Sequence, residues 1–186
     1  MSPPEVWGPA IWKLFHTLIE KMNDDAYPIV VNSMFNIITR ICKFLPCPEC
    51  SKDASNFLAK INVSNFKTKE EFKNMFYLFH NWVNVKKRKQ LYNYSNMNKY
   101  ANLDLNYVIN DFIRHYKTKG NMNLIAESFH RSFIIKDFLK WIKYYSRAFY
   151  NNSSIQNPNI IKENHIVEEK QMVEENLIVE EKQIVE

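Results

Sequence analysis

The sequence predicts an all-α protein. Apolar residues recur three and four positions apart in successive segments of the first 150 residues, which is the spacing of one helix face. No segment alternates apolar and polar residues convincingly with a period of two, so we expect no sheet. The chain has only two glycines, Gly8 and Gly120, which excludes the glycine-rich phosphate loops of Rossmann and P-loop folds.

Four helices are expected in the first 100 residues. The first covers residues 7–22 and the second residues 27–44, each with a continuous apolar stripe. The third begins at Pro48, because proline has no backbone N–H and suits the first helical position, and it runs to about residue 61. The fourth follows Thr68-x-x-Glu71, a capping box in which two side chains satisfy free backbone donors.

Two further helices are expected after a polar, Asn-rich break at residues 92–100. The first of them carries an apolar face from Leu105 to Tyr116, and Gly120 separates it from the second. The apolar face expected for the second comprises Phe129, Phe133, Ile134, Phe138, Trp141 and Tyr145. We therefore divide the chain into a core at residues 1–100, an additional helical module at 101–150 and a tail at 151–186.

The tail differs from the body in pattern and charge. A six-residue repeat beginning at Ile166-Val-Glu-Glu turns about 240° beyond a full helical turn, so its apolar pairs share no face and a solvated, weakly structured tail is expected. Residues 1–150 carry 22 basic and 12 acidic side chains, whereas residues 151–186 carry three and eight. The basic body suits a phosphate-bearing cofactor, nucleic acid or acidic partners, or is simply a solvated surface.

Three cysteines are present, too few for the disulfide framework of a small secreted protein. In the motif Cys47-Pro48-Glu49-Cys50, Cys47 is the expected N-cap and Cys50 the third helical residue, within reach of a disulfide. The positive end of the helix dipole favours a thiolate there. A catalytic disulfide, half of a zinc site and two structural cysteines all remain open, and Cys42 is expected to be a small buried hydrophobe.

Two clusters of aromatic and polar residues add to this motif. Trp12 and His16 are four residues apart and share a helix face, which alone is typical of a core. His80, Asn84 and Lys87 share a face of the fourth helix, beside its apolar stripe. Polar side chains so placed are costly without partners, and a flavin nucleotide would supply them. The alternative is a helix end that becomes exposed near residue 86.

In this order and spacing, the three clusters resemble the Erv/ALR family of FAD-linked sulfhydryl oxidases, in the short form found in large DNA viruses. The resemblance rests on Trp7-Gly8-Pro9, Trp12 and His16-Thr17, on Phe44-Leu45-Pro46-Cys47-Pro48-Glu49-Cys50, and on His80-Asn81-x-Val83-Asn84. It implies a four-helix bundle with a short fifth helix, here followed by a C-terminal helical extension. The residues that it implies to bind FAD are Trp7, Trp12, His16, His80, Asn81, Val83, Asn84, Lys86 and Lys89.

The resemblance also implies the chemistry. Cys50 would lie next to the flavin and react with it, while Cys47 would exchange with substrate; two thiols and oxygen would become a disulfide and hydrogen peroxide. The chain lacks the second cysteine pair and the shuttle dithiol of many relatives, so a protein dithiol or a small dithiol relay protein should meet Cys47 directly. A basic residue that often precedes the first-helix tryptophan is replaced by Gly8-Pro9-Ala10.

A homodimer is implied as well, because family cores pair through their first two helices. No metal, membrane or nucleic acid is expected as a partner of the oxidase. The alternative function is a non-enzymatic zinc- or nucleic-acid-binding helical adaptor.

The expected location depends on the origin of the chain. Its start lacks the basic and apolar regions of a secretory signal, and no apolar run of membrane-spanning length follows. A viral protein of this kind would act at an assembly site in the host cytoplasm or in the virion. A cellular one would act in the mitochondrial intermembrane space.

Overall fold

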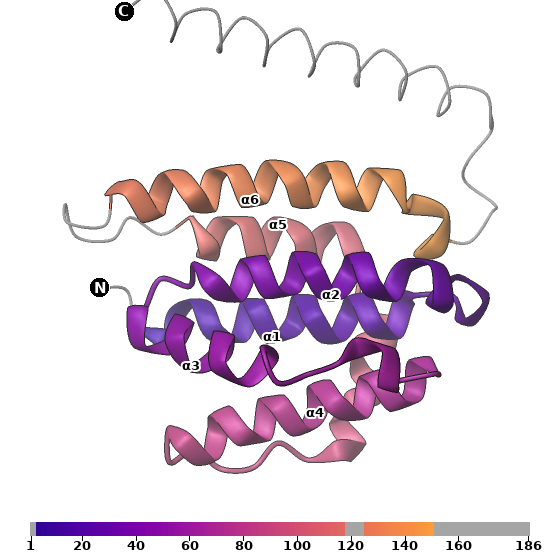
Figure 1. Cartoon of the computed structure of the whole chain (residues 1–186), viewed down its shortest axis with the longest axis horizontal. Coiled ribbons are helices and arrows are strands. Elements are labelled where there is room, and N and C mark those ends of the chain that lie inside the picture. Colours follow the sequence, from indigo (N-terminus) through magenta and orange to yellow (C-terminus); the bar gives the residue numbers. More distant parts are fainter. Residues whose placement is uncertain (1–2, 118–124, 151–186) are drawn as a thin grey trace, which may run out of the picture. The chain divides into compact units, whose positions relative to one another are not determined.

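The computed structural model describes residues 3–117 and 125–150, and over these residues the all-α fold is confirmed (Figure 1). The described α-helices are α1 (Pro4–Lys21), α2 (Tyr27–Lys43), α3 (Pro48–Leu58), α4 (Lys69–Lys86), α5 (Leu105–Tyr116) and α6 (Ile125–Tyr144). Short 3₁₀ helices are η1 (Asp24–Ala26), η2 (Val63–Asn65), η3 (Tyr94–Asn102) and η5 (Ser146–Ala148). The break at Gly120 and the repeat tail lie outside the described residues.

Proline and capping residues set the helix starts as the sequence predicts. Pro4 and Pro48 occupy the first positions of α1 and α3, where a missing N–H costs nothing. The capping box before α4 is confirmed, since the Glu71 amide donates to Thr68 Oγ1 and the Thr68 amide to Glu71 Oε2, both at 3.2 Å. The ends shift by a few residues: α1 begins three residues earlier than expected and α3 ends at Leu58.

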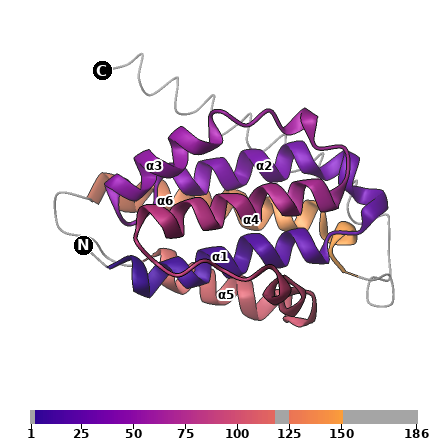
Figure 2. The ribbon, with the colours of Figure 1, turned by 90° about the horizontal axis from the view of Figure 1, so that it is seen from below.

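One hydrophobic core joins all six helices. α5 lies along α1, and α6 lies along α2 (Figures 1 and 2). Fully buried core side chains from these helices include Leu14, Ile38, Leu58, Phe76, Phe112 and Phe138. The Tyr116 hydroxyl also donates to the Ile41 carbonyl at 3.0 Å, from α5 to α2. The described part of residues 101–150 therefore packs against the helices of the first 100 residues.

The expected apolar face of α6 was wrong in two positions. Phe129 and Phe133 are 63% and 60% exposed, whereas Ile134, Ile135 and Phe138 are buried. Phe129 and Phe138 are nine residues apart, which is about half a turn beyond whole turns, so the two rings point to opposite sides of the helix. Because the segment is rich in aromatic residues, the sequence pattern pointed to the aromatic side of the helix, whereas the buried face consists mainly of isoleucines.

The expected polar break at residues 92–100 is also corrected. Most of it forms η3, in which Met97 and Tyr100 are 0% and 5% exposed. Asn93 begins this helix, because its Oδ1 accepts from the Ser95 amide at 2.9 Å. Asparagine favours such local bonds, which is why an Asn-rich stretch can start a 3₁₀ helix as readily as a loop.

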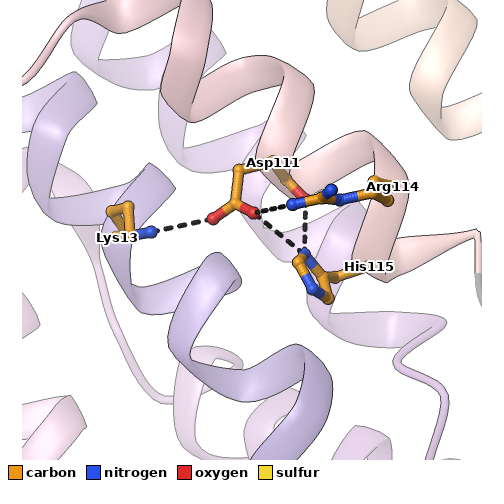
Figure 3. A network of polar contacts seen from close by, with 4 residues as sticks. All are labelled: Lys13, Asp111, Arg114 and His115. Carbon is orange, nitrogen blue, oxygen red and sulfur yellow. Dashed lines mark hydrogen bonds and ion pairs between the residues drawn. The ribbon is translucent and has the colours of Figure 1, made fainter.

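A buried carboxylate fastens α5 to α1 (Figure 3). Asp111 of α5 accepts from Lys13 Nζ of α1 at 2.8 Å, and on its own helix it also meets Arg114 at 3.3 Å and His115 at 3.1 Å. Burial on its own raises the pKa of Asp111, but the hydrogen bond and charge of Lys13, with Arg114 and His115, lower it overall. Asp111 is therefore held ionised by three basic groups.

We expect Asp111→Asn to lower the free energy of unfolding by about 1.5–3 kcal/mol at pH 7, the range for a hydrogen bond to a charged group. A carboxyl with a depressed folded pKa contributes stability above its unfolded pKa of 3.8 and loses it as the pH falls through the folded value. The deficit of the variant should thus narrow below pH 3.8 in urea unfolding curves. Asp137→Asn, which breaks a surface pair with Arg40, is the matched control and should cost less than about 1 kcal/mol. Equal costs for the two variants would contradict this role.

No helix among the described residues combines the length and the apolar composition needed to span a membrane.

Candidate active site

A cavity of about 550 Å³ opens among α1, α3, α4 and η3. Its walls are mainly aromatic and aliphatic side chains, with basic groups among them. This size and lining are typical of sites for cofactors and other small molecules. The predicted site residues that line it are Trp7, Trp12, Cys50, His80, Val83, Asn84, Lys86 and Lys89.

The two motif cysteines form a disulfide at the start of α3. Cys47 is the N-cap, as the sequence predicts, and its Sγ accepts from the Cys50 amide at 3.2 Å. Their Cα atoms are 5.2 Å apart, inside the range of ordinary disulfides. Cys50 is 9% exposed and lines the cavity, whereas Cys47 is half-buried and lies outside the lining. The disulfide therefore connects the protein surface with the interior of the cavity.

Cys42 is the third cysteine and is confirmed as a buried, free thiol. Its side chain touches the cavity wall from α2. Burial raises the pKa of the Cys42 thiol well above its ordinary value, so it is not a nucleophile at neutral pH.

Three rings stacked on one another form an aromatic wall of the cavity. The Trp12 and His80 rings are 4.2 Å apart with 9° between their planes, and the His80 and Tyr92 rings are 4.9 Å apart with 18°. Phe79 meets Trp12 edge-on at 5.2 Å and holds it in place. Such a wall offers planar ligands an apolar face with polar edges.

His16 supports this wall from behind. Its side chain is fully buried and outside the cavity lining, with Nε2 3.0 Å from His80 Nδ1. Burial, with the positive charges nearby, lowers the pKa of His16 to about 3 and that of His80 to about 4. Both rings are therefore neutral at pH 7, and one N–H is shared between them.

This pair predicts an acid-sensitive fold. A histidine with a depressed folded pKa contributes full stability above its unfolded pKa of 6.5, and that stability is lost as the pH falls toward about 3 for His16. Each such group adds a slope of up to about 1.4 kcal/mol per pH unit. The free energy of unfolding, measured in urea between pH 6.5 and 5, should fall less steeply in His16→Gln than in the wild type. Parallel curves would show that His16 titrates normally.

Of the two predicted asparagines of α4, Asn84 lines the cavity and Asn81 lies outside its lining. Val83 also lines the cavity. Asn81 does not: its Oδ1 accepts from the Tyr92 amide at 2.7 Å and its Nδ2 donates to the Tyr92 carbonyl at 3.2 Å. Asn81 thereby holds the segment that carries Tyr92 against α4, so it shapes the aromatic wall without reaching the cavity.

Lysines surround the cavity. Lys89 pairs with Glu5 at 3.0 Å and Lys87 with Glu49 at 3.4 Å. The turn that places them depends on Arg88, whose φ of 53° lies in the left-handed region where α-helices commonly end. The basic residues that line the cavity are Lys13, Lys86, Lys87, Lys89 and Lys99. An apolar cavity with this many cations suits a planar ligand that carries phosphates.

Several lining residues were not predicted. Tyr92, Lys99 and Tyr100 come from the segment that was expected to be a polar break, and Lys99 Nζ lies 5.1 Å from the Tyr92 ring centre and 5.3 Å from that of Tyr100. The signal was the tyrosines, which are unusual in a solvated Asn-rich loop. Asp53 of α3 was also missed, although it stands three residues after Cys50.

The described part of the chain contains no candidate metal site. In residues 3–117 and 125–150, no group of three or more His, Cys, Asp and Glu side chains is arranged to hold a metal ion.

Comparison with known proteins agrees with this geometry. The family model described as Erv1 / Alr family matches residues 9–102, which include the disulfide, α4 and η3. A protein of Invertebrate iridescent virus 3, named "Putative FAD-linked sulfhydryl oxidase 096R", is 29% identical over 87 residues. The match covers 46% of this chain and 59% of that protein, so the chain spans little more than half of its relative's length. No solved structure matches the chain significantly.

Proposed function

The chain belongs to the Erv1 / Alr family, and from this membership we propose that it is an FAD-dependent sulfhydryl oxidase. It would convert dithiols of protein substrates to disulfides and pass the electrons to oxygen, which gives hydrogen peroxide. One observation carries the proposal: the inner cysteine of a surface disulfide lines a cavity with an aromatic wall and basic residues.

The residues around the cavity fit FAD. Trp12, His80 and Tyr92 line the cavity with a stack of aromatic rings, which suits a flat ring system, and Val83 adds an apolar contact. Asn84 and the free edge of His80 can hydrogen-bond ring atoms. Trp7 completes the apolar wall, while Lys86 and Lys89 can hold the pyrophosphate. His16 and Asn81 act from behind, by fixing His80 and Tyr92.

The bound flavin supplies two-electron chemistry between thiols and oxygen. The chain supplies the thiol exchange. A substrate thiolate attacks Cys47 Sγ, the more exposed sulfur of the pair, and Cys50 Sγ leaves as a thiolate on the cavity side. The N-terminus of α3 stabilises the negative charge on sulfur. A second substrate thiol then resolves the mixed disulfide. The substrate leaves as a disulfide, and the Cys47–Cys50 pair beside the cavity is left reduced.

The electron donor must reach Cys47 itself. The chain has three cysteines, and Cys42 is buried and free, so no second dithiol of this chain can relay electrons. We propose a protein dithiol, or a small relay protein with its own dithiol, as the substrate. If the chain is viral, as its relative is, it would act at a cytoplasmic assembly site or in the virion; a cellular form would act in the mitochondrial intermembrane space.

We also propose a homodimer, which the family resemblance favours. Here α5 covers one side of α1 and α6 covers one side of α2. The two subunits would therefore have to meet through the surfaces of α1 and α2 that α5 and α6 do not cover. Light scattering after size-exclusion chromatography should give twice the mass of the chain, 22.3 kDa. A monomer at all concentrations would mean that α5 and α6 exclude the dimer.

The experiment that tests the proposed function is a spectrum of the purified chain combined with an oxygen-electrode assay. We expect a yellow protein that releases FAD on denaturation and consumes oxygen when it is given dithiothreitol. A colourless protein that contains zinc, or that binds DNA with strong salt dependence, would instead support the helical adaptor.

A further inference from the structure

Asp53 places a carboxylate on the wall of the cavity beside the redox pair. It stands three residues after Cys50 on α3, and side chains at that spacing are neighbours on one helix face, about 5–6 Å apart at Cβ. Both residues line the cavity. Among the described residues that line it, Asp53 is the one carboxylate.

The two oxygens of Asp53 have different surroundings. Oδ1 accepts from Lys86 Nζ of α4, which fixes the orientation of the carboxylate. Oδ2 is buried and has no hydrogen-bond partner among the described residues. A buried acceptor without a partner is costly, so Oδ2 calls for a partner such as a water molecule, a ligand or a reacting group. The side chain is 15% exposed, so bulk water reaches it poorly.

We propose that Asp53 is the proton acceptor for the Cys50 thiol, an inference that rests on the proposed oxidase function. After the thiol exchange, the Cys50 thiolate takes up a proton released by the substrate thiols. In the reduced pair this S–H bond then breaks and an O–H bond forms on Asp53 Oδ2, while the electron pair stays on sulfur. With FAD bound, the cofactor would supply the two-electron oxidant for the pair, and Cys47, whose own proton goes to water, would re-form the disulfide with the Cys50 thiolate. Asp53 finally releases its proton to water.

The other groups around the cavity are poorer acceptors. The titratable groups that share the cavity with Asp53 are Lys13 of α1, Cys42 of α2, Cys50 of α3, His80 and Lys86 of α4, Lys87 and Lys89 just beyond, and Tyr92, Lys99 and Tyr100 in and before η3. The two tyrosines are phenols, which donate a proton and do not take one up. The lysines already carry their protons, and Cys42 is a buried thiol. His80 is hydrogen-bonded to His16 through its Nδ1 at 3.0 Å, so that nitrogen is already engaged and cannot serve the thiol.

The test compares Asp53→Asn with the wild-type holoenzyme. Asparagine keeps the acceptor for Lys86 but cannot take a proton, so FAD per chain should be unchanged. Reduction of the flavin by dithiothreitol should be about 10²–10⁴-fold slower at pH 7, and the deficit should shrink toward pH 10, where the thiol ionises without a base. Asp53→Glu should recover part of the rate. Asp137→Asn, which removes a surface acid of α6 outside the cavity lining, should match the wild type at every pH.

A second measurement does not depend on turnover. The reduction potential of the Cys47–Cys50 pair can be measured in glutathione buffers, with thiol alkylation as the readout. Plotted against pH, this potential changes slope at the pH where a thiol ionises. Loss of the neighbouring negative charge should move this change of slope to lower pH in Asp53→Asn, and not in Asp137→Asn.

The proposal would be overturned if the potential of Asp53→Asn changed slope at the same pH as that of the wild type. It would also be overturned if flavin reduction in the Asp53→Asn holoenzyme had the wild-type rate and pH dependence. Loss of FAD with an unchanged profile would overturn it as well and would assign Asp53 to cofactor binding; a wild type without flavin would instead refute the oxidase function.

Discussion

Cys50→Ser is expected to abolish dithiol oxidase turnover, by at least about 10³-fold, while the protein still binds FAD. Serine is close to cysteine in size, so the aromatic wall and the lysines that are proposed to hold the cofactor remain. The loss follows because electrons can reach the cavity only through the sulfur that lines it, and a hydroxyl cannot form a disulfide. Oxygen consumption and the flavin absorbance of the same sample measure the two properties.

Two variants show whether position or mere thiol content matters. Cys47→Ser should lose turnover to a similar degree, because no sulfur would then meet substrate at the surface. Cys42→Ala should retain turnover and lose some thermal stability, since it removes a buried thiol outside the disulfide. Full turnover in Cys50→Ser would contradict the assignment of the inner sulfur.

Trp12→Ala is expected to have the largest effect on cofactor binding. Trp12 stacks on His80 and meets Phe79 and Phe15 edge-on, so its ring organises the wall as well as forming part of it. Truncation should cost about 2–4 kcal/mol of folding stability. It should also cost about 2–3 kcal/mol of FAD binding, about 100-fold in Kd. Urea unfolding and fluorescence titration of the FAD-stripped chain with FAD measure the two.

Trp12→Phe is the matched control, because it keeps a ring that can stack on His80. We expect it to lose less than half of the binding free energy that Trp12→Ala loses. If both variants bound FAD like the wild type, the cofactor would not lie against this wall, and the cavity would serve another ligand.

Much of the fold could be predicted because the strongest signals are local. The capping box at Thr68 and Glu71 and the proline at the start of α3 fix two helix starts through their own backbone bonds. The same logic placed Cys47 at the N-cap and Cys50 one turn later, as found. These features need no knowledge of which helices pack together.

What was missed depends on contacts between distant segments. Lys99 and Tyr100 line the cavity because the segment that carries them is held at Tyr92, whose backbone bonds Asn81, 11 residues earlier in the chain. The polarity of the segment alone suggests a loop. On α6, apolar composition could not tell which face meets α2, and Phe133 proved exposed. Nothing in the local sequence distinguishes Asp53 from an ordinary surface charge, whereas in the structure its side chain is 15% exposed and lines the cavity with Cys50.

Anaerobic reduction tests the central claim most directly. The claim is that electrons pass from a dithiol through Cys47 and Cys50 to a flavin held in the cavity. Without oxygen, dithiothreitol should bleach the flavin absorbance of the wild-type protein and leave that of Cys50→Ser nearly unchanged, and air should restore the wild-type colour. Equal bleaching of the two proteins, or no bound flavin in the wild type, would contradict the account.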